Sequence, residues 1–297
     1  MTAVLVESGP DTGAIWHFGE PNKEQRLLDE GLAWADLSHR EIISISGEDR
    51  LTWLHSLTTQ FLENLPANQW TQGLILDPQG HIEHQFNLVD DGSVTWLTLD
   101  PGRAELLITH LQKMKFRMRV DVRNVSGEYA LLRTPGVPDE LGGPFSIVPR
   151  TELAQWTNRL NASATQVGTW ALEAQRVAAR RPRIGFDMDY KAIPNELGLL
   201  NKSVHMNKGC YRGQESVAKI ANLGSPPRRL VLLHLDGSVV TIPSVGADVE
   251  KDGIKVGFIG TIARHYELGT IALALVKRNT PLDATLMVEG IPAIQED

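Results

Sequence analysis

The segment Lys208-Gly-Cys-Tyr-Arg-Gly-Gln-Glu215 gathers the side chains best suited to chemistry in this chain of 297 residues. It holds Cys210, the only cysteine, with the cations Lys208 and Arg212 close to it in sequence. Nearby cations lower the pKa of a thiol and make the nucleophilic thiolate more available. Two glycines allow another backbone or a ligand to approach closely. The pattern marks Cys210 as a candidate functional thiol, and a buried, unreactive cysteine is the alternative.

A basic stretch surrounds this segment. Residues 176–229 contain eleven Lys or Arg and four Asp or Glu, although the whole chain has a net charge of -7. A local excess of positive charge favours an anionic ligand, and a solvated surface is the alternative. The acidic total argues against wholesale coating of nucleic acid, so no stable nucleic-acid complex is expected.

Several common kinds of site are missing from the sequence. There is no Walker-type phosphate loop, no HExxH, no GxSxG and no set of closely spaced metal ligands. One cysteine excludes an intrachain disulfide, and it cannot alone hold an iron-sulfur cluster, which usually needs four thiolates. No permanently bound metal is therefore predicted.

The same features indicate a compartment. The sequence has no apolar run of about 18 residues, so we expect neither a transmembrane helix nor a membrane partner. Its first residues, MTAVLVESGPDTG, do not read as a signal peptide. A lone cysteine fits a reducing compartment, and a soluble, cytoplasmic protein is predicted.

Hydrophobic spacing predicts the elements of the first half. Leucines predict a helix over residues 23–35, and a capping box at 46–49 predicts a second helix that continues to Leu65. Asp100-Pro101 predicts the start of a third helix. Asp77-Pro78-Gln79-Gly80 predicts a β-turn. Strands are expected over residues 41–46, 73–77, 81–89, 93–99, 120–125 and 128–133.

The second half changes character along its length. Residues 134–149 are rich in Gly and Pro and predict a loop, and residues 183–209 lack periodicity. A long irregular segment inside a compact chain is often functional. From Arg228 onward, short strands with turns between them predict a small β domain that begins after residues 225–227. Helices are expected over residues 151–160, 169–180 and 215–223.

The string KGCYRGQE resembles the KGCYxGQE signature of the YgfZ family, which is related to the glycine-cleavage T protein, an aminomethyltransferase. The resemblance extends over nearly the whole chain. It includes the segments DLSHREIISISGEDRLTWLHSL, ILDPQGHIEHQFNL, IPNELGLL and SPPRRLVLLHLDG.

This resemblance implies an α+β fold of three domains around a central folate site. A discontinuous first domain would comprise residues 1–45 and 135–224. A ferredoxin-like α+β domain would span residues 46–134, and a small β-barrel residues 225–297. Members of the family bind tetrahydrofolate or a related folate. They are implicated in assembling or maintaining iron-sulfur clusters in client enzymes, some of which modify tRNA.

The resemblance also assigns residues. Cys210 would be the functional thiol, with Lys208 beside it in the reactive centre. Glu196 would pair with the amide and amino edge of a pterin, and the anionic tail of folate would meet Arg228 or Arg229, since arginine matches a carboxylate bidentately. The other residues expected to bind the folate are Tyr211, Arg212, Gln214 and Glu83.

The chain also departs from the T protein. Glu83 and His84 stand where that protein carries an acidic pair used in aminomethyl transfer, and the T-protein motif lacks Cys210. The main interpretation is therefore an accessory role in iron-sulfur cluster maintenance, with folate, assembly factors and client proteins as partners. A folate-dependent aminomethyl or one-carbon transferase or demethylase is the alternative. A third reading is an RNA or protein partner that binds no folate.

Overall fold

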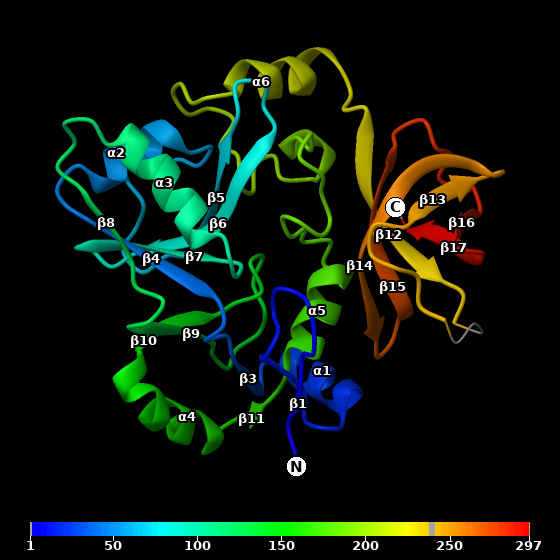
Figure 1. Ribbon diagram of the computed structural model, residues 1–297, viewed down its shortest axis with the longest axis horizontal. Helices are drawn as coiled ribbons and strands as arrows, with labels where there is room; N and C mark the ends of the chain where they lie inside the picture. Colours follow the sequence, from blue (N-terminus) through cyan, green and yellow to red (C-terminus); the bar gives the residue numbers. More distant parts are fainter. Residues whose placement is uncertain (1, 238–240, 297) are drawn as a thin grey trace. The chain divides into compact units, whose positions relative to one another are not determined.

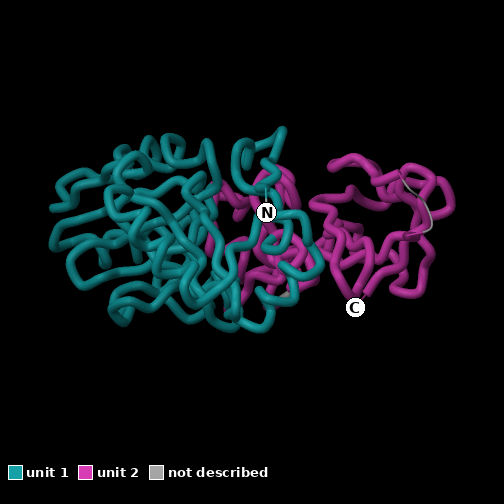
Figure 2. Tube along the Cα trace, turned by 90° about the horizontal axis from the view of Figure 1, so that it is seen from below, with its two compact units in different colours: residues 1–75, 84–172, 202–212 teal, residues 76–83, 173–201, 213–297 magenta. Residues whose placement is uncertain are grey.

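A computed structural model describes residues 2–237 and 241–296. The chain forms two compact units, coloured separately in Figure 2. Unit 1 contains residues 1–75, 84–172 and 202–212. Unit 2 contains residues 76–83, 173–201 and 213–297. The predicted boundaries of three domains stay a prediction.

The first sheet of unit 1 has the order β5-β6-β7-β4-β8 (Figure 1). Helices α2 and α3 pack against it. Along β4, Ile43 and Ile45 join the core beneath these helices, whereas Ile42 joins a second core with Leu131 on the other face. Side chains alternate between the faces of a strand, so both faces of β4 are buried. The elements are α2 (Arg50–Leu57), α3 (Ala104–Met114), β4 (Glu41–Ser46), β5 (Thr71–Leu76), β6 (Ile82–Asp90), β7 (Val94–Leu99) and β8 (Asp121–Asn124).

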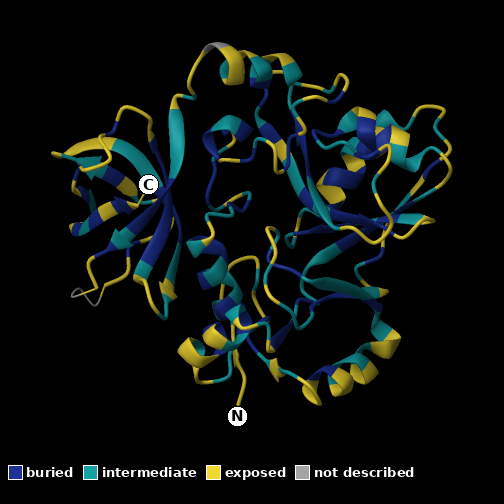
Figure 3. Ribbon diagram, turned by 180° about the vertical axis from the view of Figure 1, so that it is seen from behind, coloured by how far each residue is buried: buried dark blue, intermediate teal, exposed yellow. Residues whose placement is uncertain are grey.

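Unit 1 also contains a second sheet, of order β10-β9-β3-β11. Its core contains Trp34 and Leu132, and α4 covers it with one face while exposing the other (Figure 3). The elements are β1 (Val4–Leu5), β2 (Ile15–His17), α1 (Pro21–Asp29), β3 (Ala33–Asp36), β9 (Tyr129–Arg133), β10 (Phe145–Pro149), η1 (Arg150–Glu152), α4 (Leu153–Asn161) and β11 (Thr165–Gln166). Helix α5 (Thr169–Ala178) begins in unit 1 and belongs to unit 2 from Glu173 onward.

Unit 2 contains a closed barrel of order β12-β15-β14-β13-β16-β17. Alternate residues of β12, such as Val231 and Leu233, fill the barrel core. Leu232 faces outward and packs with Val177 of α5. The elements are η2 (Pro194–Glu196), α6 (Gln214–Leu223), β12 (Arg228–Leu235), β13 (Asp248–Lys251), β14 (Ile254–His265), β15 (Gly269–Lys277), β16 (Leu286–Val288) and β17 (Ile291–Glu296).

The α+β class, the C-terminal barrel and the Asp77 turn are confirmed. The helix predicted over residues 23–35 is wrong in its second half, because α1 ends at Asp29 and Ala33–Asp36 is a strand. Gly31 has a φ of +73° just past α1. This left-handed conformation ends the helix and is strained for most residues other than glycine. The loop predicted over residues 134–149 also contains a strand, β10.

Two predicted helices begin later in the chain than expected, and at each start a carboxylate makes a contact that the sequence did not predict. Asp49 makes no side-chain cap on α2 and instead binds Arg119. Helix α2 then ends at Leu57, well before the predicted Leu65. Helix α3 begins at Ala104 rather than beside Pro101, because Glu41 accepts hydrogen bonds from the first free N–H groups, including that of Ala104 at 2.6 Å.

Candidate functional site

Lys208 of the motif lies buried in unit 1 at the end of α2. Its Nζ donates hydrogen bonds to the backbone carbonyls of His55, Thr58 (2.5 Å) and Gln60 (3.0 Å). The last carbonyls of a helix have no partner inside the helix, and an ammonium group has three donors. Lys208 therefore fastens the motif to the end of α2. Its assignment to the reactive centre stays a prediction.

The neighbours of Lys208 set its electrostatics. Burial lowers the pKa of Lys208 to about 8. Its Nζ lies 5.4 Å from the centre of the Tyr211 ring, and burial raises the pKa of that phenol to about 12. Cys210 lies between these two side chains in sequence and is exposed. The motif thus anchors its first and fourth residues in unit 1 and presents its thiol at the surface.

Glu196, Arg228 and Asp189 form a second cluster, in unit 2, which we call the Arg228 clamp. Arg228 donates to both oxygens of Glu196, from Nε and Nη2, at 2.8 Å each. It donates to Asp189 from Nη1 at 2.6 Å and from Nη2 at 3.1 Å. The Glu196 side chain is 1% exposed and that of Asp189 is 35% exposed. The guanidinium therefore bridges a buried carboxylate and a more accessible one.

The charges of the clamp stabilise one another. Burial by itself would lower the pKa of Arg228, but the hydrogen bonds and charges of Glu196 and Asp189 raise it above its ordinary value. Burial would raise the pKa of Asp189, and the Arg228 guanidinium holds it below its ordinary value. The Arg228 guanidinium and the Asp189 carboxylate therefore stabilise each other's charged forms.

The clamp bears on two of the predicted folate contacts. The structure pairs Glu196 and Arg228, which the sequence assigned to opposite ends of the ligand. A carboxylate offers about four acceptor positions. Arg228 uses two of those on Glu196, and the Ile193 N–H, at 3.3 Å, uses a third. One position remains for a ligand, and Arg228 is placed to orient Glu196. The folate roles of both residues stay predictions.

Arg229 faces away from the clamp, because neighbouring residues of a strand point in opposite directions. Its Nη2 donates to the Thr280 carbonyl at 2.9 Å and to Gln295 Oε1 at 2.7 Å. The structure therefore does not bring Arg229 together with Arg228. Its assignment to the folate tail stays a prediction.

The remaining predicted residues are divided between the units. Arg212 belongs to unit 1, whereas the exposed Glu83 and the half-buried Gln214 belong to unit 2, where Gln214 begins α6. Gly213 precedes α6 with a φ of +82°, and a Cβ there would lie 2.6 Å from the Asp77 carbonyl. Glycine is thus required where the Asp77 turn packs against the start of α6.

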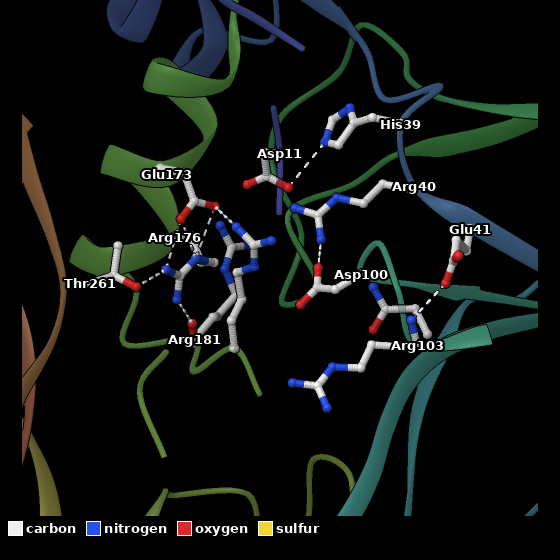
Figure 4. Close-up of polar contacts among 12 residues, drawn as sticks. Asp11, His39, Arg40, Glu41, Asp100, Arg103, Glu173, Arg176, Arg181 and Thr261 are labelled. Carbon is white, nitrogen blue, oxygen red and sulfur yellow. Dashed lines mark hydrogen bonds and ion pairs between the residues drawn. The ribbon is translucent and has the colours of Figure 1, made fainter. Parts of the chain in front are cut away.

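Sequence reasoning missed a buried ionic network in unit 2 (Figure 4). Arg176 donates to Glu173 at 2.8 Å, to Asp187 at 2.7 Å and to the Thr261 hydroxyl at 2.6 Å. Asp187 also accepts from the Thr261 N–H at 2.7 Å. A Cβ at Gly260 would lie 2.4 Å from Asp187 Oδ1. The sequence shows only the helical spacing of Glu173 and Arg176. The network ties α5 and the irregular loop to the barrel strand β14.

The DLSHR segment has local structural roles in unit 1. Asp36 accepts a hydrogen bond from the Ser38 N–H at 2.8 Å, and His39 lies 3.4 Å from Asp11. Arg40 pairs with Asp100, also drawn in Figure 4. These contacts tie the end of β3 to neighbouring loops.

Within residues 2–237 and 241–296, no three His, Cys, Asp or Glu side chains gather as metal ligands would. The absence of a permanent metal stays a prediction. None of the helices in the same residues combines the length and apolar character needed to cross a membrane.

Comparisons with known proteins show which proteins this chain resembles. No protein-family model matches the chain. A chloroplast protein of Arabidopsis thaliana, provisionally named a transferase, is 25% identical over 91% of this chain and 73% of its own length. An iron-sulfur cluster assembly factor IBA57 homolog of Chaetomium globosum is 27% identical over 85% and 73%. The tRNA-modifying protein YgfZ of Vibrio atlanticus is 22% identical over 88% and 89%.

Among solved structures, the glycine cleavage system aminomethyltransferase T of Bartonella henselae matches with a TM-score of 0.82. It is 17% identical, and the match covers 99% of this chain and 92% of that one. The fold is therefore that of the T protein. With its KGCYRGQE motif, the chain is similar to YgfZ and IBA57 proteins and has the fold of the glycine-cleavage T protein.

Proposed function

We propose that this protein is a tetrahydrofolate-binding accessory factor in the assembly or maintenance of iron-sulfur clusters. Its clients would include tRNA-modifying enzymes, and it would act in the cytoplasm. The observation that carries the proposal is the exposed Cys210 in a motif whose flanking Lys208 and Tyr211 are anchored in unit 1. The names of the relatives support the same role.

Cys210 would act toward a partner. A thiol that is exposed on a fixed segment can reach a cluster or a thiol of another protein. A single cysteine provides at most one of the four thiolates that a cluster usually needs, so the remaining ligands would come from a client or an assembly factor. The iron-sulfur cluster is then cargo and not a resident group.

Folate would use the Arg228 clamp. Arg228 holds Glu196 in place with two hydrogen bonds, and one acceptor position of Glu196 remains for the amino and amide edge of a pterin. This acceptor position therefore fits the hydrogen-bond donors at the pterin end of the ligand. Tetrahydrofolate would bring its one-carbon chemistry, and the residues of the clamp would orient it.

A one-carbon transferase of the T-protein type is the alternative, because the fold is that of a T protein. The local chemistry disfavours it. His84 stands at one of the two acidic positions, and burial, with the nearby charges of His110 and Arg103, lowers its pKa to about 4. A neutral imidazole cannot supply the negative charge of a carboxylate. Release of formaldehyde or ammonia from methylated amines would favour the alternative.

Calorimetric titration of tetrahydrofolate and of its 5-formyl form into wild type, Glu196→Gln and Cys210→Ser tests the proposal. We expect Glu196→Gln to weaken binding at least about tenfold, the effect of about 1.4 kcal/mol, and Cys210→Ser to bind normally. In cells that lack the protein, Cys210→Ser should fail to restore the activity of an iron-sulfur tRNA-modifying enzyme. Arg123→Gln, at an exposed ion pair, is the control.

The two halves of the proposal fail separately. Wild type that binds no folate at millimolar concentration would remove the folate half. Full restoration of client activity by Cys210→Ser would remove the thiol half. Thermal unfolding of each variant distinguishes a lost contact from a lost fold.

A further inference from the structure

The turn that joins α3 to β8 exposes a strained aromatic residue. Phe116 is 87% exposed and has a φ of +43°. It follows Lys115, the last cap of α3, at the position where helices usually place glycine. The left-handed conformation is unfavourable for a bulky L-residue, and an exposed ring gains no packing in return. Strain without benefit to the fold points to a use outside the fold.

The chain holds this turn from both sides. Before it, the carbonyl of Met114 accepts a hydrogen bond from Trp53 Nε1 at 3.1 Å. After it, Met118 packs on the core of unit 1, and Arg119 donates to Asp49 from its backbone at 2.8 Å and from Nη2 at 2.7 Å. The turn lies beside α2 (Figure 1), and these contacts fix the backbone that carries Phe116.

Positive charges flank the ring. Lys115 and Arg117 are its neighbours in sequence, and the exposed Lys113 lies on the last turn of α3. Among residues 2–237 and 241–296, these three cations form no ion pair. Arg119 differs, because it is paired with Asp49 and Glu48. We define the basic aromatic turn as residues 113–117.

We propose that the basic aromatic turn binds single-stranded nucleic acid, with a base stacked on Phe116 and phosphates beside Lys113, Lys115 and Arg117. One exposed ring between cations is what a single unpaired base and its phosphates need. A protein interface usually buries about 800 Å² on each partner, and membrane anchoring needs a larger apolar patch. Because the whole chain has a net charge of -7 and repels nucleic acid elsewhere, we expect the nucleic acid to bind at this turn alone. The complex is then transient and salt-sensitive.

Fluorescence anisotropy of a fluorescein-labelled oligoadenylate with the full-length protein tests this site. Phe116→Gly should weaken binding about tenfold, within the range for loss of one stacked base. The same variant should raise the melting temperature by about 2 °C, because glycine accepts the left-handed conformation without strain. A gain in stability with a loss of binding separates a partner site from a structural residue.

Matched variants sharpen the test. Phe116→Trp should bind as wild type does, and Phe116→Leu should bind as weakly as Phe116→Gly, because leucine has no ring to stack. Leu106→Ala, at an exposed apolar residue on α3 outside the turn, should bind normally. Arg117→Gln should lower the slope of log affinity against log salt by about 0.7, the value for one phosphate contact on a single strand.

Three results would overturn the proposal. The first is wild type that does not bind oligoadenylate at low salt, and the second is a Phe116→Gly variant that binds it equally well. The third is binding only to vesicles of phosphatidylglycerol, lost in Phe116→Gly, which would assign the turn to an anionic lipid surface instead. None of these results bears on folate or on Cys210.

Discussion

The two cations of the candidate site, Lys208 and Arg228, donate hydrogen bonds to different kinds of partner. In unit 1, Lys208 meets backbone carbonyls, and burial lowers its pKa to about 8. In unit 2, Arg228 meets two carboxylates, whose hydrogen bonds overcome burial and raise its pKa. Carbonyl groups accept hydrogen bonds from a cation but carry no net charge to balance it. Carboxylates both accept the hydrogen bonds and balance the charge.

This contrast separates two ways of holding a functional segment. The carbonyl-bound lysine can lose its proton without leaving a buried charge behind, so its contribution to folding varies with pH. The clamp pairs its one cation with two carboxylates, so each charge depends on the others. We therefore expect the clamp to be sensitive to single substitutions and the stability contributed at Lys208 to rise as the pH increases above about 8.

The largest effect is expected at the clamp. Arg228→Met would leave the Glu196 carboxylate, 1% exposed, with no charged partner and only the Ile193 N–H as a donor. Removal of one partner from a buried ion pair costs about 3 to 5 kcal/mol. Urea unfolding followed by circular dichroism should show a loss of that size in the free energy of unfolding.

A double variant provides the control for this prediction. Arg228→Met with Glu196→Leu replaces both charges by apolar groups and should recover most of the lost stability. Arg123→Met, at an exposed ion pair, should leave the free energy of unfolding nearly unchanged. A loss below about 1 kcal/mol in Arg228→Met would mean that Glu196 finds another partner or water.

The second effect concerns the pH dependence of Lys208. Its pKa is about 8 in the folded protein, against an ordinary value of 10.5. Between these values the unfolded chain binds more protons than the folded one, so stability rises with pH. Relative to Lys208→Met, wild type should gain up to about 3 kcal/mol across this window, at about 1.4 kcal/mol for each pKa unit.

The measurement is urea unfolding of wild type and Lys208→Met at pH 8 and pH 10.5, the two ends of the window. The difference between the proteins cancels the titration of other groups. A constant difference across the window would mean that the carbonyls hold Lys208 fully charged, and the contrast with Arg228 would then disappear.

Much of the fold could be predicted from local patterns. The alternation in β4 and in the barrel strands is a property of each strand alone, and the sequence predicted both. The prediction places residues 33–35 in a helix, because their short apolar pattern fits either structure. The antiparallel pairing of Ala35 with Arg133 and of Asp36 with Leu132 makes this segment a strand, and no local signal reveals it.

The candidate site was predictable as a set of residues but not as a set of contacts. The motif singled out Lys208 and Cys210, and the resemblance singled out Glu196 and Arg228. The pairing of Glu196 with Arg228, 32 residues apart, depends on the path of the irregular loop. The anchor of Lys208 on the Gln60 carbonyl spans 148 residues. Contacts over such separations are set by the tertiary fold and not by spacing.

The smallest effect tests whether Lys208 is charged beside Tyr211. A cation at 5.4 Å from an aromatic ring centre gains about 0.5 to 1 kcal/mol. Tyr211→Leu should lower the free energy of unfolding by about that amount at pH 7, and the loss should vanish above the pKa of Lys208, where no cation remains. Tyr211→Phe keeps the ring and should show neither change. Equal losses in both variants would assign the effect to the phenol hydroxyl, and Lys208 would then depend on its carbonyls alone.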